Sequence, residues 1–197
     1  MKDIDENLLL DYIAACTNLY GVTPFEKVLE IYHTYTENRI SLEALVAFVN
    51  EPPVKEKLEE RFVHVYRDTF VAEVLHIFNE KKALEQAAAG KPFYVPEKNE
   101  LLSYMDQFYF QQTPQQERLK EMMREDFDAS VNIEEEVEQL VLDLQMSGGE
   151  FTKELSDFLG RLGLPVEKAE RYIPAVIEIA NTTRLWENRG HTPSELM

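Results

Sequence analysis

The sequence of 197 residues contains 44% hydrophobic and 11% aromatic residues, values typical of a globular protein and outside the range of disordered chains. It has 20 Lys and Arg residues against 37 Asp and Glu residues, which gives a formal net charge of −17, and this negative field opposes binding to nucleic acids and to anionic membranes. The single cysteine, Cys16, excludes an intramolecular disulfide and a cysteine-cluster zinc site.

The first predicted element is a helix over residues 3–19, ended by Gly21. Asp3, Asp5 and Glu6 stand where an export signal needs positive charge, and no segment reaches the roughly 18 apolar residues that cross a membrane. We therefore expect a soluble, cytoplasmic protein in which this helix belongs to the fold.

Two further helices are predicted from their caps. The segment Thr23-Pro24-Phe25-Glu26 has the residues of a capping box and precedes an apolar stripe, so a helix is expected to begin there. Ser41 predicts the cap of a third helix, which Pro52-Pro53 would stop.

The segment "RFVHVYRDTFVAEVL" changes the period and predicts a β-hairpin at about 61–75, with strands over 61–66 and 69–75 around Arg67-Asp68. Three helices followed by a hairpin is the order of elements in a winged-helix fold, which contains a helix-turn-helix. A DNA-reading third helix needs basic or amide side chains, and the predicted one, "SLEALVAFVNE", contains no Lys or Arg. This composition disfavours DNA as the partner.

A predicted helix at about 79–89 ends at Gly90, and the linker "KPFYVP" follows with two prolines. The linker is apolar, so we expect it to pack against the fold. We predict a mainly α protein with two modules. Residues 1–91 form a winged-helix-like helical module with one hairpin, and residues 92–197 form an acidic α-helical module.

Apolar spacing from Pro96 onward is helical throughout. Thr113-Pro114-Gln115-Gln116 repeats the capping signature, and Gly148-Gly149 and Gly163 each predict the end of a helix. A last long helix is expected from about Pro165 toward Leu185, kinked or split by the internal Pro174.

The sequence offers no motif for catalysis, cofactor binding or metal binding, and we assign no residue to these roles. None of the four histidines stands at metal-ligand spacing with another, and the acidic run at 134–138 is expected to be a solvated helix face. Cys16 lies on the apolar side of its helix without a nearby His and is expected to be inert. The histidines are His33, His64, His76 and His191.

The carboxy-terminal tail has two interpretations. In the first, Trp186 packs on the core, Gly190 ends a helix and Thr192 begins a short one. In the second, the tail is a recognition patch, because Trp and Arg are enriched at interface hot spots. The residues of this candidate interaction patch are Arg184, Trp186, Glu187, Asn188, Arg189 and His191.

Three segments carry a family resemblance: "NLYGVTPFEKVLEIYHTYTENRISLEALV", "FYVPEKNELLSYMDQFYFQQTP" and "NTTRLWENRGHTPSEL". They resemble helical proteins of Firmicutes that are related to SEC-C motif-containing proteins, in which a cysteine-rich zinc-binding tail follows a string of the form "WENRGHTPxEL". This chain has no cysteine after Cys16, so the resemblance implies neither zinc nor a cofactor here. It implies a bacterial cytoplasmic protein and carries no activity over.

We expect a non-catalytic protein-interaction or regulatory module with protein partners, and a homo-oligomer remains open. One alternative is a metal-dependent hydrolase or a small-molecule-binding enzyme. Another is a nucleic-acid-associated regulator that acts through the winged helix, which the net charge of −17 disfavours.

Overall fold

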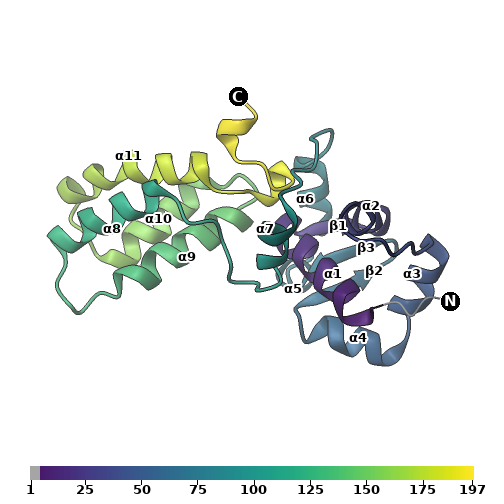
Figure 1. The fold of residues 1–197 in the computed structure, drawn as a ribbon. Coiled ribbons are helices and arrows are strands. Elements are labelled where there is room, and N and C mark those ends of the chain that lie inside the picture. The colour runs from purple at the N-terminus through teal and green to yellow at the C-terminus, as the bar shows by residue number, and fades with distance from the viewer. Residues whose placement is uncertain (1–4) are drawn as a thin grey trace. The chain divides into compact units, whose positions relative to one another are not determined.

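The structure is a computed structural model that describes residues 5–197, apart from the side chain of Val166. Helices make up 63% of the chain and strands 6%, which confirms the mainly α fold. The chain divides into two compact units, Met1–Tyr109 and Phe110–Met197 (Figure 1). The first unit carries 19 acidic and 11 basic residues and the second carries 18 and 9, so both units are acidic.

The first unit combines helices with a small sheet. The elements before the hairpin are α1 (Glu6–Tyr20), β1 (Val22–Pro24), α2 (Phe25–Tyr35), α3 (Leu42–Val49) and α4 (Pro52–Glu59). The hairpin and the elements after it are β2 (Val63–Tyr66), β3 (Thr69–Ala72), α5 (Glu73–Ile77), α6 (Lys81–Ala87) and α7 (Lys98–Ser103). The sequence predicts three helices before the hairpin, whereas the structure has four helices, α1 to α4, and the strand β1 before it (Figure 1).

Helix α1 is the central element of this unit, because every residue from Tyr12 to Tyr20 is buried. Asp5 caps it by accepting a hydrogen bond from the Leu8 amide at 3.1 Å, and Gly21 ends it with a φ of 73°, a conformation that favours glycine. Residues 3 and 4 of the predicted helix lie outside the described residues.

The three strands form an antiparallel sheet in the order β1-β3-β2. The hairpin turns at Arg67-Asp68 as predicted, and Val63 pairs with Ala72. Its second strand was predicted to reach residue 75, but it ends at Ala72 because α5 begins at Glu73. Strand β1 was not predicted from the sequence, because it has only three residues and pairs with β3 at a separation of 49 positions, from Val22 to Val71.

The predicted cap at Thr23 is wrong. The Thr23 hydroxyl donates to the Cys16 carbonyl at 3.1 Å, and the residue that caps α2 is Pro24, without a side-chain hydrogen bond. The reason is that Thr23 is in β1, where it pairs with Phe70, so its side chain faces the core and not the first turn of α2.

The prediction that Pro52-Pro53 stop a helix needs a correction as well. Helix α3 ends at Val49, after the predicted Ser41 cap, and the two prolines open α4, where missing N–H donors cost nothing. The helix directly before the hairpin is therefore α4. Val54 and Leu58 bury one side of it, and the other side is exposed.

The predicted module boundary after residue 91 also differs from the structure. The Tyr20 hydroxyl donates to the Tyr94 carbonyl and the Tyr35 hydroxyl donates to the Pro96 carbonyl, both at 2.6 Å. Leu101 belongs to the core of the first unit. The linker packs against the fold, as predicted. The residues that follow it, up to Tyr109, also belong to the first unit.

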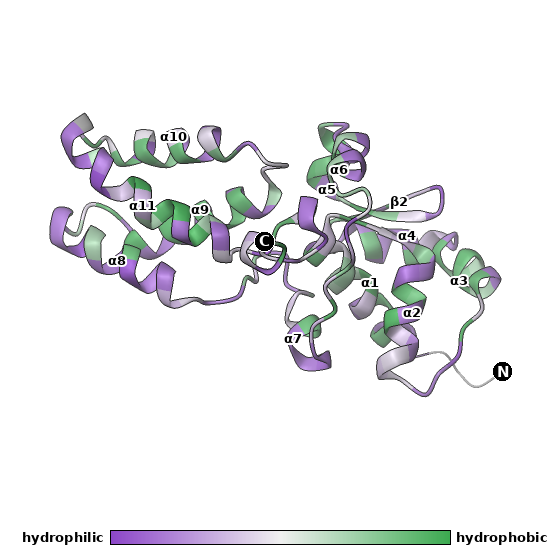
Figure 2. Cartoon of the chain, turned by 90° about the horizontal axis from the view of Figure 1, so that it is seen from above, coloured by the Kyte–Doolittle hydropathy of each residue, from purple (hydrophilic) through white to green (hydrophobic). Residues whose placement is uncertain are grey.

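The second unit is a bundle of helices with two 3₁₀ turns: α8 (Pro114–Asp126), α9 (Ile133–Met146), α10 (Phe151–Leu162), α11 (Val166–Thr182), η1 (Trp186–Asn188) and η2 (Pro193–Glu195). Hydrophobic and hydrophilic residues alternate along the helices (Figure 2), and their apolar sides share one core around Leu140, Phe158 and Val176. The predicted capping box at Thr113 is present, and α11 continues through Pro174 without splitting.

Candidate interaction surface on the hairpin

Strand β2 presents two different faces. Val63 is buried in the core of the first unit, and Val65 packs against that core. Because side chains alternate along a strand, His64 and Tyr66 lie on the opposite, outer face. Phe62 directly precedes the strand.

Residues 73–81 run along this outer face of β2. The Glu73 amide donates to the Phe62 carbonyl at 2.9 Å, the rings of His76 and His64 stack with centroids 4.4 Å apart, and the Lys81 ammonium lies 5.4 Å from the centroid of the Tyr66 ring. The contacts follow one another in the same order on both segments. They fix α5 beside the hairpin and orient the rest of α5 outward.

The result is a surface of apolar and aromatic side chains, which we name the wing face. Ile77 is 64% exposed, Phe78 is 66% exposed and Phe62 is 40% exposed. Scattered single apolar residues are common on protein surfaces, but adjacent large ones rimmed by polar residues mark interaction sites. The wing face comprises Phe62, His64, Tyr66, His76, Ile77 and Phe78.

The backbone of Phe62 is in the left-handed region, with a φ of 60°. Its amide donates to the Glu59 carbonyl at 2.9 Å, in the turn that follows the Glu60 cap of α4. A side chain in this conformation costs about 1 kcal/mol. An aromatic residue therefore occupies, half exposed, a position that glycine would fill without strain, and such outliers concentrate at functional sites.

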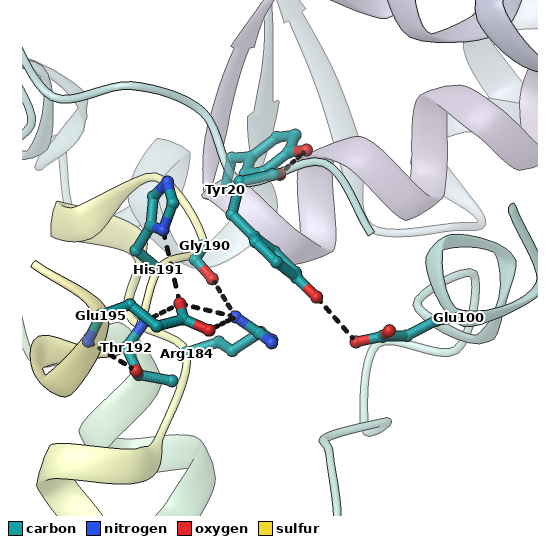
Figure 3. Close-up of polar contacts among 8 residues, drawn as sticks. Tyr20, Glu100, Arg184, Gly190, His191, Thr192 and Glu195 are labelled. Carbon is teal, nitrogen blue, oxygen red and sulfur yellow. Dashed lines mark hydrogen bonds and ion pairs between the residues drawn. The ribbon is translucent and has the colours of Figure 1, made fainter. Parts of the chain in front are cut away.

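Residues of the candidate patch in the tail lie in a folded structure. Arg184 is buried, donates to the Gly190 carbonyl at 3.1 Å and forms an ion pair with Glu195 at 3.1 Å (Figure 3). Glu195 also accepts from the Thr192 amide at 3.0 Å and completes the capping box of η2. His191 Nδ1 lies 3.4 Å from the same carboxylate.

The remaining patch residues are buried or half-buried as well. Trp186 is only 5% exposed and Asn188 is buried, whereas Glu187 and Arg189 are half-buried. The packed interpretation of Trp186 agrees with this placement. An open patch centred on an exposed Trp does not, because the indole is inside the structure.

Electrostatics reinforce the closed tail. Burial alone would raise the pKa of Glu195, but the Thr192 amide, the Arg184 guanidinium and His191 together hold that pKa below its ordinary value. The carboxylate thus stays charged at the centre of its hydrogen bonds.

The other titratable candidates have structural partners. His33 Nε2 accepts from the Ile40 amide at 3.1 Å, and burial followed by the charge of Arg39 lowers its pKa. Burial raises the pKa of Cys16 well above its usual range, which agrees with an inert thiol. Within residues 5–197, no group of three or more His, Cys, Asp or Glu residues could hold a metal ion.

A shallow hollow of about 570 Å³ lies at the loop between α8 and α9 in the second unit. Its polar side chains are engaged in local structure. Arg124 pairs with Glu134 at 2.8 Å, Asp128 accepts from the Ser130 amide, and Asn132 caps α9. The hollow therefore does not bring together a free acid and a free base of the kind that general acid–base catalysis uses.

The wing face was not predicted from the sequence. The signal was present as an apolar pair, Ile77-Phe78, directly before the polar turn at 79–80. It was hidden because residues 69–75 were interpreted as a strand, which left no helix to orient the pair.

Comparisons with protein-family models, with curated proteins and with solved structures found no match. The resemblance to the SEC-C-related Firmicutes proteins therefore stays a prediction. Among the described helices, none is both long enough and apolar enough to span a bilayer.

Proposed function

We propose that the protein is a protein-interaction module that engages a partner protein through the wing face. The observation that carries this proposal is the exposure of Ile77 and Phe78, neighbours in sequence that are each about two-thirds exposed. Phe62, which is 40% exposed, is tied to the start of the same helix through the hydrogen bond from the Glu73 amide to its carbonyl. Water around exposed large apolar side chains is released when a partner covers them, and this release is the main favourable contribution in protein association.

The neighbouring charges favour a protein over DNA as this partner. Helix α4 stands directly before the hairpin, where a winged helix carries its recognition helix, and it exposes Lys55 and Lys57. Glu56 and Glu59 are exposed on the same short helix and offset both lysines. The helix thus lacks the positive charge that would bring it onto phosphates against a net charge of −17.

The test is affinity capture from a lysate of the source organism, followed by quantitative mass spectrometry. The wild type is compared with Ile77→Ser/Phe78→Ser and with the control Ile177→Ser, which changes a residue that is 41% exposed on α11 of the second unit. We expect the wild type and the control to retain one stoichiometric partner that the double variant loses.

Equal recovery of the partner by all three proteins would contradict the wing face as the docking site. Repeated captures with no stoichiometric partner for the wild type would contradict the interaction function itself. Thermal unfolding of each variant supplies the folding control, because substitutions at exposed positions change stability by less than about 0.5 kcal/mol.

A further inference from the structure

We infer that the partner bound by the wing face is a second copy of this chain, so that the protein forms a homodimer through the surface that carries Ile77 and Phe78. This inference rests on the proposed function and names its partner. It follows from how the net charge is distributed along the chain.

The segment that contains the wing face carries no net charge. Residues 52–82, from the start of α4 to the first turn of α6, contain six acidic and six basic residues. The rest of the chain contains 31 acidic and 14 basic residues, so the whole net charge of −17 lies outside this segment. Helices α4 and α5 both pack against β2, so the segment is also one continuous part of the first unit. The exposed pair Ile77 and Phe78 therefore belongs to a neutral part of a strongly acidic chain.

The charge around a docking surface indicates the charge of the partner that fits it. A basic partner gains most from an acidic surround, which the rest of this chain supplies. An acidic partner is repelled by such a surround, because like charges brought together oppose association. A neutral surround removes this repulsion at close range, and exposed charges farther away than about 8 Å are largely screened at physiological salt. The wing face thus fits a partner that is itself acidic.

A second copy of the chain is an acidic protein that carries the same neutral surface. In the commonest form of homo-oligomer, a dimer with two-fold symmetry, the same patch of both subunits meets itself. Such a patch needs apolar side chains that can cover each other and charges of both signs in similar numbers. Residues 52–82 meet both requirements, since Ile77 and Phe78 are each about two-thirds exposed and the acids equal the bases.

Helix α4 shows that charges of both signs on this segment are free to pair across such a contact. Lys55 and Lys57 are exposed and form no ion pair with any described residue. The same holds for Glu56 and Glu59 of that helix. Exposed ion pairs between two copies would add little affinity but would fix their orientation, whereas the apolar contacts supply the affinity.

A second group of exposed apolar residues provides a contrast. Phe108 is 65% exposed and Met105 is 45% exposed, close to the values on the wing face. Residues 97–109, to which they belong, contain three acids and one base. Two copies that met through this acidic segment would repel each other, so Phe108 is a matched control position for Phe78.

The test is sedimentation equilibrium of the full chain at about 150 mM salt, over concentrations that bracket a Kd of about 10 μM. We expect the mass to rise with concentration from 23.0 kDa toward twice this value. Ile77→Ser/Phe78→Ser should raise the Kd of the dimer at least about tenfold, whereas Phe108→Ser should change it less than about twofold. Circular dichroism of each variant checks that it is folded.

Two charge variants test the neutral surround. Lys55→Glu/Lys57→Glu leaves the segment with eight acids and four bases in place of six and six. Arg39→Glu/Arg118→Glu makes the same change in total charge at two exposed positions outside the segment. At about 150 mM salt, we expect the first variant to raise the Kd about tenfold and the second to raise it less than about threefold. At about 1 M salt, where the Debye length is about 3 Å, the first variant should approach the Kd of the wild type at the same salt.

A mass of 23.0 kDa at every concentration would overturn the inference. A dimer that Ile77→Ser/Phe78→Ser leaves intact would also overturn it, and so would an equal loss in the two charge variants, since that result assigns the effect to the total charge of the chain.

A failure of the inference can be told apart from a failure of the proposed function. In the lysate capture, the inference makes the untagged chain of the source organism the stoichiometric partner. Recovery of a different protein that depends on Ile77 and Phe78, by a chain that stays monomeric, would keep the docking surface and replace the second copy with that protein.

Discussion

The wing face and the carboxy-terminal tail both combine aromatic and charged residues, but the structure uses them in opposite ways. In the tail, Trp186 is buried and Arg184 is held by Gly190 and Glu195. On the wing face, Phe78 is largely exposed although it follows a helix whose Leu75 is buried. A Trp with neighbouring Arg residues therefore indicates an interaction surface only when nothing in the chain covers it.

The difference has a local cause in each region. The tail contains its own capping box, so Glu195 returns to the Thr192 amide and to Arg184 and closes the segment. Helix α5 has only five residues and buries Leu75 alone, so the next apolar residues, Ile77 and Phe78, turn outward. The tail buries its Trp186 and pairs Arg184 with Glu195, whereas the wing face leaves Ile77 and Phe78 exposed.

The largest expected effect tests the buried side of this comparison. Trp186→Ala should lower the free energy of unfolding by about 3 kcal/mol, because it removes a large buried side chain and leaves a cavity. Phe78→Ala should change it by less than about 0.5 kcal/mol, because the ring is mostly in water already. Urea unfolding followed by circular dichroism measures both. Equal losses for the two variants would remove the contrast between the regions.

A second, smaller effect concerns the charge at the centre of the tail. Glu195→Gln keeps an acceptor for the Thr192 amide but takes the counter-charge from the buried Arg184. Removing one partner of a fully buried pair costs about 3–5 kcal/mol, but the Glu195 side chain is 39% exposed, so we expect about 1 kcal/mol at neutral pH.

The pH dependence of the same variant checks the cause. The pKa of Glu195 is lower in the folded protein than in the unfolded chain, so its contribution to stability is present above the unfolded pKa and is lost as the pH falls through the folded one. The difference in stability between wild type and Glu195→Gln should therefore shrink below about pH 4.5. A difference that stays constant from pH 7 to pH 3 would contradict the role of the carboxylate charge.

Local signals were enough to predict the helical class, the hairpin turn at Arg67-Asp68 and the caps at Ser41 and Thr113. These features depend on neighbouring residues, and neighbouring residues are visible in a sequence. The same capping signature failed at Thr23, because pairing of Thr23 with Phe70, far along the chain, placed it in a strand. Strand pairing across such a separation overrode a local preference.

Long-range packing also explains why the module boundary and the candidate site were missed. Tyr20 and Tyr35 hold residues 94 and 96 through hydrogen bonds to backbone carbonyls, which residue types alone do not reveal. The wing face depends on α5 lying beside β2, a contact fixed by the stacking of His64 on His76. Trp186 had two interpretations in the sequence, and its burial distinguishes them.

The smallest expected change in stability is at Phe62, and it gives the sharpest separation of folding from function. Phe62→Gly removes the strain of a φ of 60°, and the gain of about 1 kcal/mol offsets the loss of half-buried contacts and the greater freedom of glycine in the unfolded chain. We expect a free energy of unfolding within about 0.5 kcal/mol of the wild type together with loss of the captured partner.

Phe62→Ala serves as the matched control. It also loses the ring but keeps a side chain in the strained conformation, so it should be less stable than Phe62→Gly and equally unable to bind. If Phe62→Gly binds the partner like the wild type, the strained ring has no part in recognition, and the wing face is reduced to Ile77 and Phe78.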